Sequence, residues 1–376
     1  MPFAFTGARV FDGDSFRDGQ AVVVSAGRIA FVIPQSQLNA SIRRHELPGG
    51  ILAPGFIDVQ VNGGGGALLN DNPDASAVRR MAEAHRRFGT TGMLPTVITD
   101  RPEILAQAIG AVRAAQAAPV PGVLGIHIEG PFLDAARKGA HEARYIRTMN
   151  PADVAQIAGA DCGVVMLTLA PNKVEPALIE ALAAQGVLVS LGHSGATHAE
   201  IQPALAAGAR AFTHLFNAMS QISPREPGMA GTALSHRDSW VGVIADGHHV
   251  HDACLKLAFA AKPLERFMLI SDAMPPAAGG PDAFELQGRR VRRIHGRLVL
   301  EDNTLAGSCL TMDEAVRNCV ANLDVSLADA LRMASLNPAR FIRRGHEQGR
   351  IKSGYLANLV HLRDDLTVAA TWIEGK

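Results

Sequence analysis

The sequence predicts an α/β protein: a (β/α)8 TIM barrel with a small second β-sandwich-like domain built from both chain ends. Between residues 51 and 345, short apolar runs alternate with longer stretches that carry helix signals. The apolar runs are nearly continuous, which is typical of parallel strands covered on both faces. Eight of them follow one another, and eight strand–helix units fit a closed barrel better than an open sheet.

Residues 1–50 are predicted to form short strands and turns. The segments ARVFDG (8–13), AVVVSAGRIAFVI (21–33) and IRRHELPGG (42–50) carry β-branched residues interrupted by Asp-Gly, Ala-Gly and Pro-Gly. The same pattern returns in residues 346–376. We therefore expect both chain ends to form one small β-domain beside the barrel domain at 51–345.

The barrel strands are expected at the eight apolar runs, in chain order. They are ILAPGFIDV (51–59), TTGMLPTVI (90–98), GVLGIHIEG (122–130), GVVMLTLAP (163–171), GVLVSLGHS (186–194), RAFTHLFNA (210–218), WVGVIADGH (240–248) and RFMLISDAM (266–274). Helix signals lie between them: residues 197–208, for example, open with Thr197 and Glu200 at capping-box spacing and close with a glycine. Residues 283–303 are expected to form a hairpin insertion after the eighth strand.

Composition excludes several classes of partner. Apolar residues make up 47% of the chain, which is enough for a sizeable core, and 36 Lys+Arg balance 36 Asp+Glu. This balance does not indicate a nucleic-acid partner. No apolar run is long enough to span a membrane and no signal peptide is recognisable, so no membrane partner is expected. The four cysteines lack CxxC spacing and are interpreted as reduced, buried thiols of a cytoplasmic protein.

Four side chains that can do chemistry end four of the expected strands. Glu129 ends the third strand, and the fifth, sixth and eighth end in His193, His214 and Asp272. In such barrels the carboxyl ends of the strands carry the active site. One carboxylate and two imidazoles form a typical three-ligand set for a catalytic zinc, and a nearby aspartate can transfer protons. Each residue alone could be structural, such as a helix cap or an ion pair with arginine, but their joint placement favours a metal site.

His127 and an arginine cluster are interpreted as structural rather than as ligand-binding residues. His127 faces the same side as Glu129 and is expected to support the site or fill the core rather than bind metal. The arginine cluster RRVRRIHGR (289–297) is interpreted as a solvated hairpin face, because a nucleic-acid role would need interleaved aromatic residues.

The motifs, taken together, resemble the N-acetylglucosamine-6-phosphate deacetylase family of the amidohydrolase superfamily over nearly the whole chain. They are PGFIDVQVNGGGG (54–66), HIEGPFL (127–133), KGAH (138–141), GHSGAT (192–197), THLFNAM (213–219), REPGMAG (225–231), DGHHV (246–250), SDAM (271–274) and LAGSCLTM (305–312). The resemblance implies hydrolysis of the acetamide of N-acetyl-D-glucosamine 6-phosphate to D-glucosamine 6-phosphate and acetate. Two alternatives remain: another N-acetylated sugar phosphate, such as the galactosamine isomer, or a non-catalytic scaffold that kept the fold.

The resemblance also implies a role for individual residues. Glu129, His193 and His214 would hold one divalent metal ion per subunit, Zn²⁺ with Fe²⁺ as the alternative, and Asp272 and His249 would be catalytic. The substrate-binding residues would be Ala140, His141, Asn217, Ala218, Arg225, His249, Leu305, Ala306 and Gly307. The family is typically dimeric, so a homodimer is expected in which phosphate contacts from Arg225 and His249 cross the interface.

Gln60 and Asn62 indicate how many metals the site holds. Many amidohydrolases have His-x-His at the end of the first strand and bind a second metal with it, whereas this chain has two neutral amides, which are weak metal ligands. The resemblance is therefore to a single-metal Gln-x-Asn branch, in which Gln60 would orient the water that the metal activates. Alternatively, the amides are structural and glycines 63–66 form only a tight turn.

Overall fold

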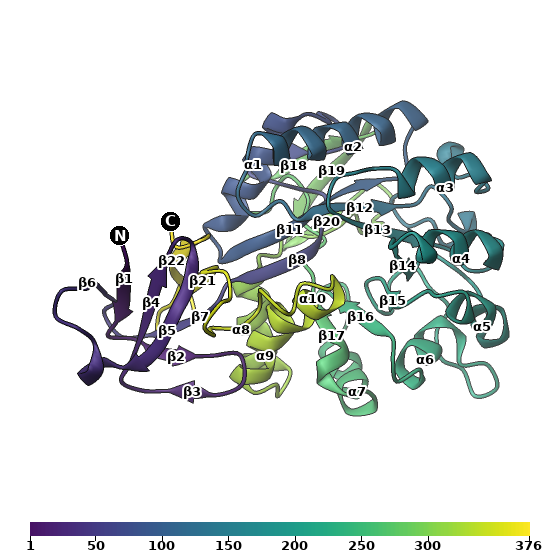
Figure 1. Ribbon diagram of the computed structural model, residues 1–376. Coiled ribbons are helices and arrows are strands. Elements are labelled where there is room, and N and C mark those ends of the chain that lie inside the picture. The colour runs from purple at the N-terminus through teal and green to yellow at the C-terminus, as the bar shows by residue number, and fades with distance from the viewer.

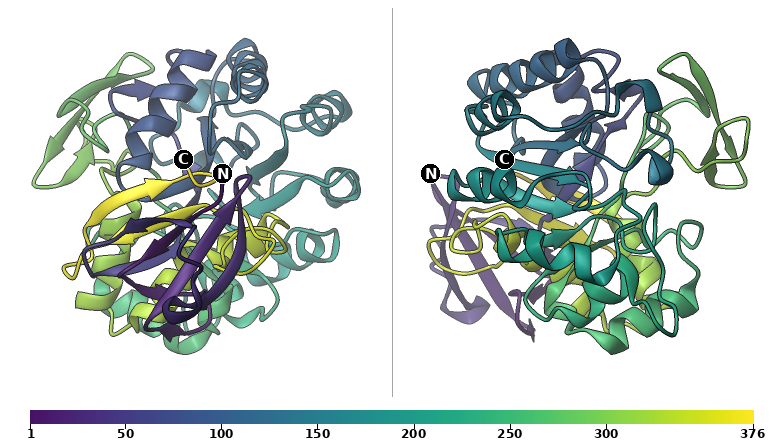
Figure 2. Two further views of the ribbon diagram at one scale, coloured as in Figure 1. Left: turned by 60° about the vertical axis from the view of Figure 1, so that its left-hand side comes forward. Right: turned by 90° about the vertical axis from the view of Figure 1, so that its right-hand side faces the viewer.

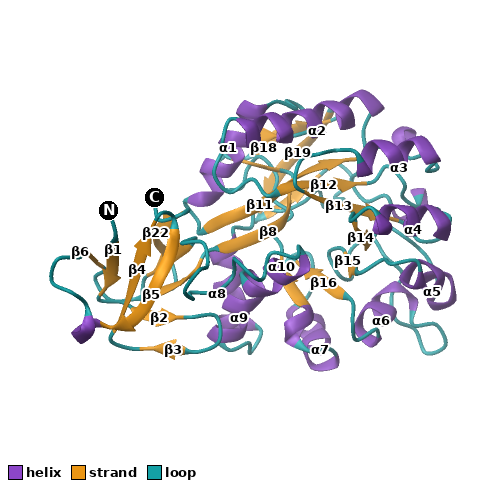
Figure 3. Ribbon diagram, in the orientation of Figure 1, coloured by secondary structure: helices purple, strands orange, loops and turns teal.

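The computed structural model describes residues 1–376 and contains eight parallel strands arranged as a barrel (Figure 1). In barrel order they are β8 (Phe56–Val61), β11 (Thr90–Ile98), β12 (Gly125–Glu129), β13 (Val164–Leu169), β14 (Leu188–Leu191), β15 (Ala211–Phe212), β16 (Trp240–Val243) and β17 (Phe267–Leu269). Helices lie outside the strands, as Figure 3 shows by colour. Each of the eight apolar runs contributes one strand to the barrel, which confirms the predicted barrel, although the first run also contains a strand of the small β-domain.

Ten α-helices are present. They are α1 (Ala75–Arg86), α2 (Pro102–Ala117), α3 (Pro151–Ala158), α4 (Pro176–Ala184), α5 (His198–Ala206), α6 (Gly228–Ser235), α7 (Asp252–Ala261), α8 (Met312–Asn322), α9 (Leu327–Ala334) and α10 (Leu336–Phe341). Of these, α1, α3, α5, α7 and α9 each begin at a residue whose side chain caps the first turn. The predicted capping box of α5 is present: Thr197 accepts from the Glu200 N–H, and the Glu200 side chain accepts from the Thr197 N–H. Each helix is too short or too polar to cross a bilayer.

The first expected strand, 51–59, is two strands. β7 (Ile51–Pro54) pairs with strands of the terminal β-domain, and β8 pairs with β11 in the barrel. The break falls at Gly55, where a Cβ would lie 2.2 Å from the Thr91 side chain. The sequence does not show this break, because both strands are largely buried and their residues form one continuous apolar run.

Both chain ends build the small β-domain. One sheet contains β1 (Phe3–Thr6), β4 (Gln20–Ser25), β5 (Arg28–Pro34) and β6 (Arg43–Glu46); the other contains β2 (Arg9–Phe11), β3 (Phe16–Arg17), β7, β21 (Leu359–Leu362) and β22 (Val368–Trp372). Phe5, Leu52 and Leu359 are buried together between segments that are far apart in sequence. The two termini lie close together in space (Figure 2), in agreement with the predicted architecture.

Side-chain and loop contacts, rather than a full strand ladder, close the barrel between β8 and β17. The Asp272 N–H donates to Gln60 O at 3.0 Å, and the Asn62 N–H donates to Ala273 O at 2.9 Å. Below them the buried Asp58 carboxylate accepts from the Ser271 N–H at 3.3 Å. This seam brings the amides at 60 and 62 beside Asp272.

The insertion after the eighth strand is a three-stranded antiparallel sheet, not the single hairpin that the sequence indicated. Its strands are β18 (Ala283–Leu286), β19 (Arg289–Ile294) and β20 (Arg297–Val299). The sheet projects from the end of the barrel opposite the small β-domain (Figure 2). Its buried side chains share an apolar cluster with Ile98 and Met274 of the barrel.

The cysteines agree with the sequence only in part. All four are free thiols, as expected. Cys162 and Cys319 are buried and Cys309 is half-buried, but Cys254 is exposed on α7. The expectation that all four are buried is wrong, because α7 is amphipathic and Cys254 lies on its outer face, in the same helix as the buried Leu255 and Ala258.

Candidate metal centre

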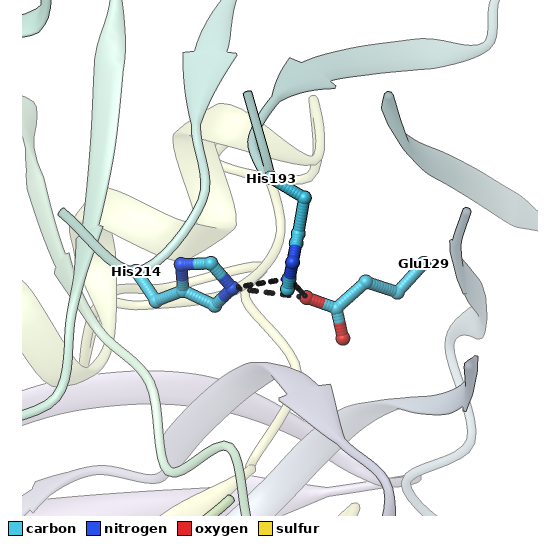
Figure 4. A group of neighbouring side chains, drawn as sticks. All are labelled: Glu129, His193 and His214. Atoms are coloured by element: carbon cyan, nitrogen blue, oxygen red, sulfur yellow. Dashed lines mark hydrogen bonds and ion pairs between the residues drawn. The ribbon is translucent and has the colours of Figure 1, made fainter. Parts of the chain in front are cut away.

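Glu129, His193 and His214 converge at the carboxyl end of the barrel (Figure 4). Both histidine Nε2 atoms lie 3.1 Å from Glu129 Oε1, and the two Nε2 atoms are 2.9 Å apart. Ligands about 2.0–2.1 Å from a tetrahedral zinc lie about 3.3 Å from one another, so the three donor atoms are spaced almost as such an ion requires. All three residues are buried. The chemistry and spacing of this donor set fit one divalent cation.

Contacts behind the triad prepare its atoms for a cation. His193 Nδ1 lies 3.0 Å from Arg137 O, which accepts a hydrogen bond from Nδ1–H and leaves the lone pair of Nε2 free for a cation. Burial alone would raise the pKa of Glu129, but hydrogen bonds from His193 and His214 hold it well below its usual value. The carboxylate is therefore ionised at neutral pH, as a metal ligand must be.

The backbone is strained where these side chains enter the site. His193, His214 and Asp272 have φ angles of 47°, 33° and 50°. Non-glycine residues in this region cost on the order of 1–3 kcal/mol each, and they persist only where surrounding contacts fix them. Such angles at three residues that face one centre are typical of a functional site.

The two amides of the first strand face Asp272. Asn62 Nδ2 donates to Asp272 Oδ1 at 2.6 Å, while Gln60 Nε2 donates to Asp272 Oδ1 at 3.2 Å and to Glu129 Oε1 at 3.1 Å. Burial, followed by the charge of Glu129, raises the pKa of Asp272 to about 6. A cation bound beside it would favour the ionised form and lower that value.

A chain of buried hydroxyls lies directly beneath the triad. Thr213 Oγ1 is 2.6 Å from Ser190 Oγ and 2.7 Å from Thr168 Oγ1, and Thr168 Oγ1 is 2.8 Å from His127 Nε2. His127 Nδ1 is 3.3 Å from Thr96 Oγ1. These side chains connect β11, β12, β13, β14 and β15, including every strand that leads to a metal-binding candidate. His127 thus supports the site from below, as the sequence suggested.

The number of available protons fixes the donor and the acceptor of each hydrogen bond in this series of side chains. Thr96 donates its only hydroxyl proton to Leu94 O and therefore accepts from His127 Nδ1–H. His127 Nε2 must then accept from Thr168, which accepts from Thr213, which accepts from Ser190. Burial lowers the pKa of His127 to about 4, so the ring is neutral and fits this single tautomer.

A cavity of about 350 Å³ opens above the triad. The residues that the resemblance assigned and that line it are Asn62, Glu129, Ala140, His141, His193, His214, Asn217, Ala218, His249, Asp272, Leu305 and Gly307. Ala306 and Gln60 are buried and do not line it, and Arg225, exposed on the loop before α6, does not line it either. Glycines 63–66 do not line the cavity either. β9 (Gly63–Gly64) pairs with β10 (Ala67–Leu68), and Gly65 and Gly66 between them have φ angles of 58° and 82°, which favours the interpretation as a tight turn.

Several lining residues were missed by the sequence reasoning: Ile98, Ala136, Arg137, Gly139, Met274 and Thr304. Met274 and Ile98 carried a usable signal, since both stand at or just after ends of predicted barrel strands. Arg137 carried no sequence signal, because its contact with His193 uses a backbone oxygen. His249 is fixed by Asp246, whose Oδ2 lies 2.7 Å from His249 Nδ1. His249 Nε2 takes no part in this contact.

The fold and the triad together define a metal-dependent hydrolase of the amidohydrolase class. A family model described as "Amidohydrolase family" matches residues 51–376, and one described as "NagA composite domain" matches residues 2–52. The chain belongs to the amidohydrolase family, and within it to the N-acetylated amino sugar 6-phosphate deacetylases.

Three relatives document this membership. The chain is 41% identical to the N-acetylgalactosamine-6-phosphate deacetylase of Shewanella sp. (strain ANA-3), over 98% of this chain and 94% of the relative. The crystal structure of N-acetylglucosamine-6-phosphate deacetylase from Pasteurella multocida superposes with a TM-score of 0.97 at 33% identity, covering 100% and 99% of the chains. A Mycobacterium smegmatis enzyme of the same name, a variant in complex with N-acetyl-D-glucosamine-6-phosphate, gives 0.92 at 30% identity, covering 100% and 98%.

Proposed function

We propose that the protein hydrolyses the acetamide of N-acetyl-D-glucosamine 6-phosphate to D-glucosamine 6-phosphate and acetate. The observation that carries this proposal is the convergence of Glu129, His193, His214 and Asp272 on one cavity. Full-length relatives named as deacetylases of amino sugar 6-phosphates support it. The direct test is acetate release from this substrate with and without a chelator. Activity that the chelator does not affect would exclude the metal-dependent reaction.

The proposed mechanism assigns proton transfer to Asp272. When bound by the triad, a divalent cation supplies Lewis acidity that polarises the acetyl carbonyl and acidifies water. Asp272, ionised beside that charge, accepts a proton from the attacking water and later donates it to the departing amine. Asn62 and Gln60 hold the Asp272 carboxylate in one orientation through their N–H donors. His249, fixed by Asp246, stabilises the negative oxygen that develops on the acetyl carbon.

The role of Asp272 has a separate test. Asp272→Asn keeps the size of the side chain but removes the proton acceptor, so kcat should fall by at least about 10²-fold. Metal content, measured by elemental analysis, should stay at one ion per chain. Turnover near the wild-type rate with metal still bound would contradict the assignment.

We propose Zn²⁺ as the cofactor, one ion per subunit, with Fe²⁺ as the alternative. The Glu129–His193–His214 set suits both ions, so elemental analysis after expression in zinc-supplemented and iron-supplemented media distinguishes them. We also propose a cytoplasmic location, which the four free thiols support.

We propose a homodimer in which Arg225 binds the 6-phosphate of a substrate held by the partner subunit. Arg225 is exposed and does not line the cavity of its own chain, which supports this arrangement. A guanidinium fork is suited to phosphate. Mixing Arg225→Ala with Asp272→Asn subunits should restore activity, because hybrid dimers contain one site with both residues. No recovery on mixing would exclude the shared site.

A second candidate substrate is N-acetyl-D-galactosamine 6-phosphate. The relative that is 41% identical bears that name, which favours the galactosamine isomer as an alternative. The two sugars differ only in the orientation of the hydroxyl at C4. Comparison of kcat/KM for both sugar phosphates under identical conditions decides which is the preferred substrate.

A further inference from the structure

One arginine of the arginine-rich insertion strand does not belong to a solvated face. Side chains alternate along β19, so Arg289 and Val291 share one face while Arg290 points to the other. Val291 is fully buried in the apolar cluster that also contains Ile98 and Met274, two cavity-lining residues. Arg290 is exposed. Arg289 therefore faces the barrel mouth, whereas its sequence neighbour faces solvent.

Arg289 contacts the turn that supplies part of the cavity wall. Its Nη2 donates to Ala140 O at 2.5 Å, and its Nε lies 3.7 Å from Glu142 Oε2. Only 28% of the Arg289 side chain is exposed. Ala140 and His141 both line the cavity, and the Ala140 N–H makes no hydrogen bond within the chain. The guanidinium thus binds a peptide whose neighbouring N–H remains available to a ligand.

The hairpin turn before Arg289 contacts the cavity wall at a second point, the loop that contains Thr99. Gln287 and Gly288 have φ angles of 54° and 78°, as a two-residue hairpin turn between β18 and β19 requires. At this turn Gln287 Nε2 donates to Thr99 O at 2.7 Å, and Thr99 Oγ1 is 2.8 Å from His141 Nδ1. The insertion sheet therefore contacts both loops that position His141.

We propose that Arg289 is a positioning residue for substrate binding: it fixes the turn 138–142, so that Ala140 and His141 present their polar groups to the sugar. This inference rests on the proposed function. A trans peptide is planar, so a fixed Ala140 carbonyl also fixes the opposed His141 N–H, which donates to Lys138 O at 3.1 Å. An arginine donor makes this hydrogen bond charge-assisted and stronger than one between neutral groups. The insertion sheet is thus part of the substrate site, although it contributes no group to the chemistry.

The test compares three variants of the full-length protein. Arg289→Met keeps the apolar stem and removes the guanidinium, Arg289→Lys restores one donor, and Arg290→Met is the matched control on the exposed face. For Arg289→Met we expect KM to rise about tenfold with kcat within about threefold of wild type, because a binding interaction shared by ground and transition states affects KM alone. Arg289→Lys should recover part of the loss, and Arg290→Met should leave KM unchanged. Metal content should be one ion per chain throughout.

Hydrogen–deuterium exchange of the substrate-free protein gives a readout that needs no activity. Exchange in residues 138–142 should quicken in Arg289→Met and not in Arg290→Met. Unchanged exchange in this segment, or quicker exchange without a rise in KM, would overturn the proposal. If the wild-type protein hydrolyses neither amino sugar phosphate, the proposed function fails, and the exchange result alone decides whether Arg289 fixes the turn.

Discussion

Thr213 is the central member of the hydroxyl chain beneath the triad, and its replacement by valine tests what that chain contributes. Thr213→Val conserves shape but removes the hydroxyl that accepts from Ser190 and donates to Thr168. Ser190 and Thr213 are both fully or almost fully buried, so water cannot replace the lost partner at little cost. An unsatisfied buried polar group costs about 1–3 kcal/mol, and we expect a loss of about 2 kcal/mol in the free energy of unfolding.

The same substitution should also weaken metal binding. Thr213 directly precedes His214, and its hydroxyl connects the strands that carry the ligands at strained φ angles. Loss of supporting contacts around a metal typically costs about 10–100-fold in affinity, and because Thr213 acts through the backbone we expect the lower end of that range. Metal affinity is measured by competition with a chromophoric chelator, and the free energy of unfolding by urea denaturation of the chelator-treated protein.

Two control variants make this prediction sharp. Thr213→Ser keeps the hydroxyl and should retain wild-type metal affinity. Thr90→Val removes a buried hydroxyl that has no hydrogen-bond partner and lies at the amino end of β11. This substitution should change the free energy of unfolding by less than about 0.5 kcal/mol. The reasoning is refuted if Thr213→Val and Thr90→Val are equally stable, or if Thr213→Val lowers stability while metal affinity stays within twofold of wild type.

Three further predictions concern titration, thiol access and the metal. Burial raises the pKa of Asp58 from 3.8 to about 7, so its contribution to the free energy of unfolding is complete below pH 3.8 and is lost as the pH rises towards 7. Urea denaturation should show this loss in the wild type but not in Asp58→Asn. Parallel pH profiles of the two proteins would contradict the prediction. A thiol reagent at neutral pH should modify the exposed Cys254 first, while Cys162 and Cys319 react only after unfolding. Both of these thiols are buried, and burial raises their pKa to about 11 and about 12. Equal early labelling of the three cysteines, measured by peptide mapping, would exclude this prediction. Glu129→Gln replaces the anionic ligand by a neutral amide and should reduce bound metal from one ion per chain to almost none by elemental analysis; full retention would remove Glu129 from the ligand set.

The convergence of Glu129, His193 and His214 could be predicted from the sequence because strand position alone determines where those side chains meet. Glu129, His193 and His214 each stand at the carboxyl end of an apolar run, and parallel strands bring these ends to one rim of the barrel. Neither the distances between the residues nor the contacts behind them were needed for that inference. The prediction therefore depended on topology, which hydrophobic patterning specifies well.

The supporting contacts were beyond reach for a physical reason. His193 is oriented by a backbone oxygen of Arg137, and any residue type offers such an oxygen. The seam beside Asp58 joins β8 to β17, the two barrel strands most distant in sequence, through a few contacts that no local pattern encodes. Arg289 was different: the cluster was interpreted as a solvated face, but the apolar Val291 two residues later shares the face of Arg289 in a strand and was a usable signal that this arginine faces inward.

The amides at the end of the first strand support the proposal that the site holds one cation. Asn62 and Gln60 direct N–H donors at Asp272, and their own oxygens are buried without partners, so the donor side of each amide meets the carboxylate. Neutral histidines used as ligands would present lone pairs in this region, and those would repel a carboxylate unless a second cation lay between them. With amides, Asp272 is held by neutral donors instead. Its orientation then does not require a second metal, and with the one proposed cation bound, its proton affinity would respond to the charge of that ion alone.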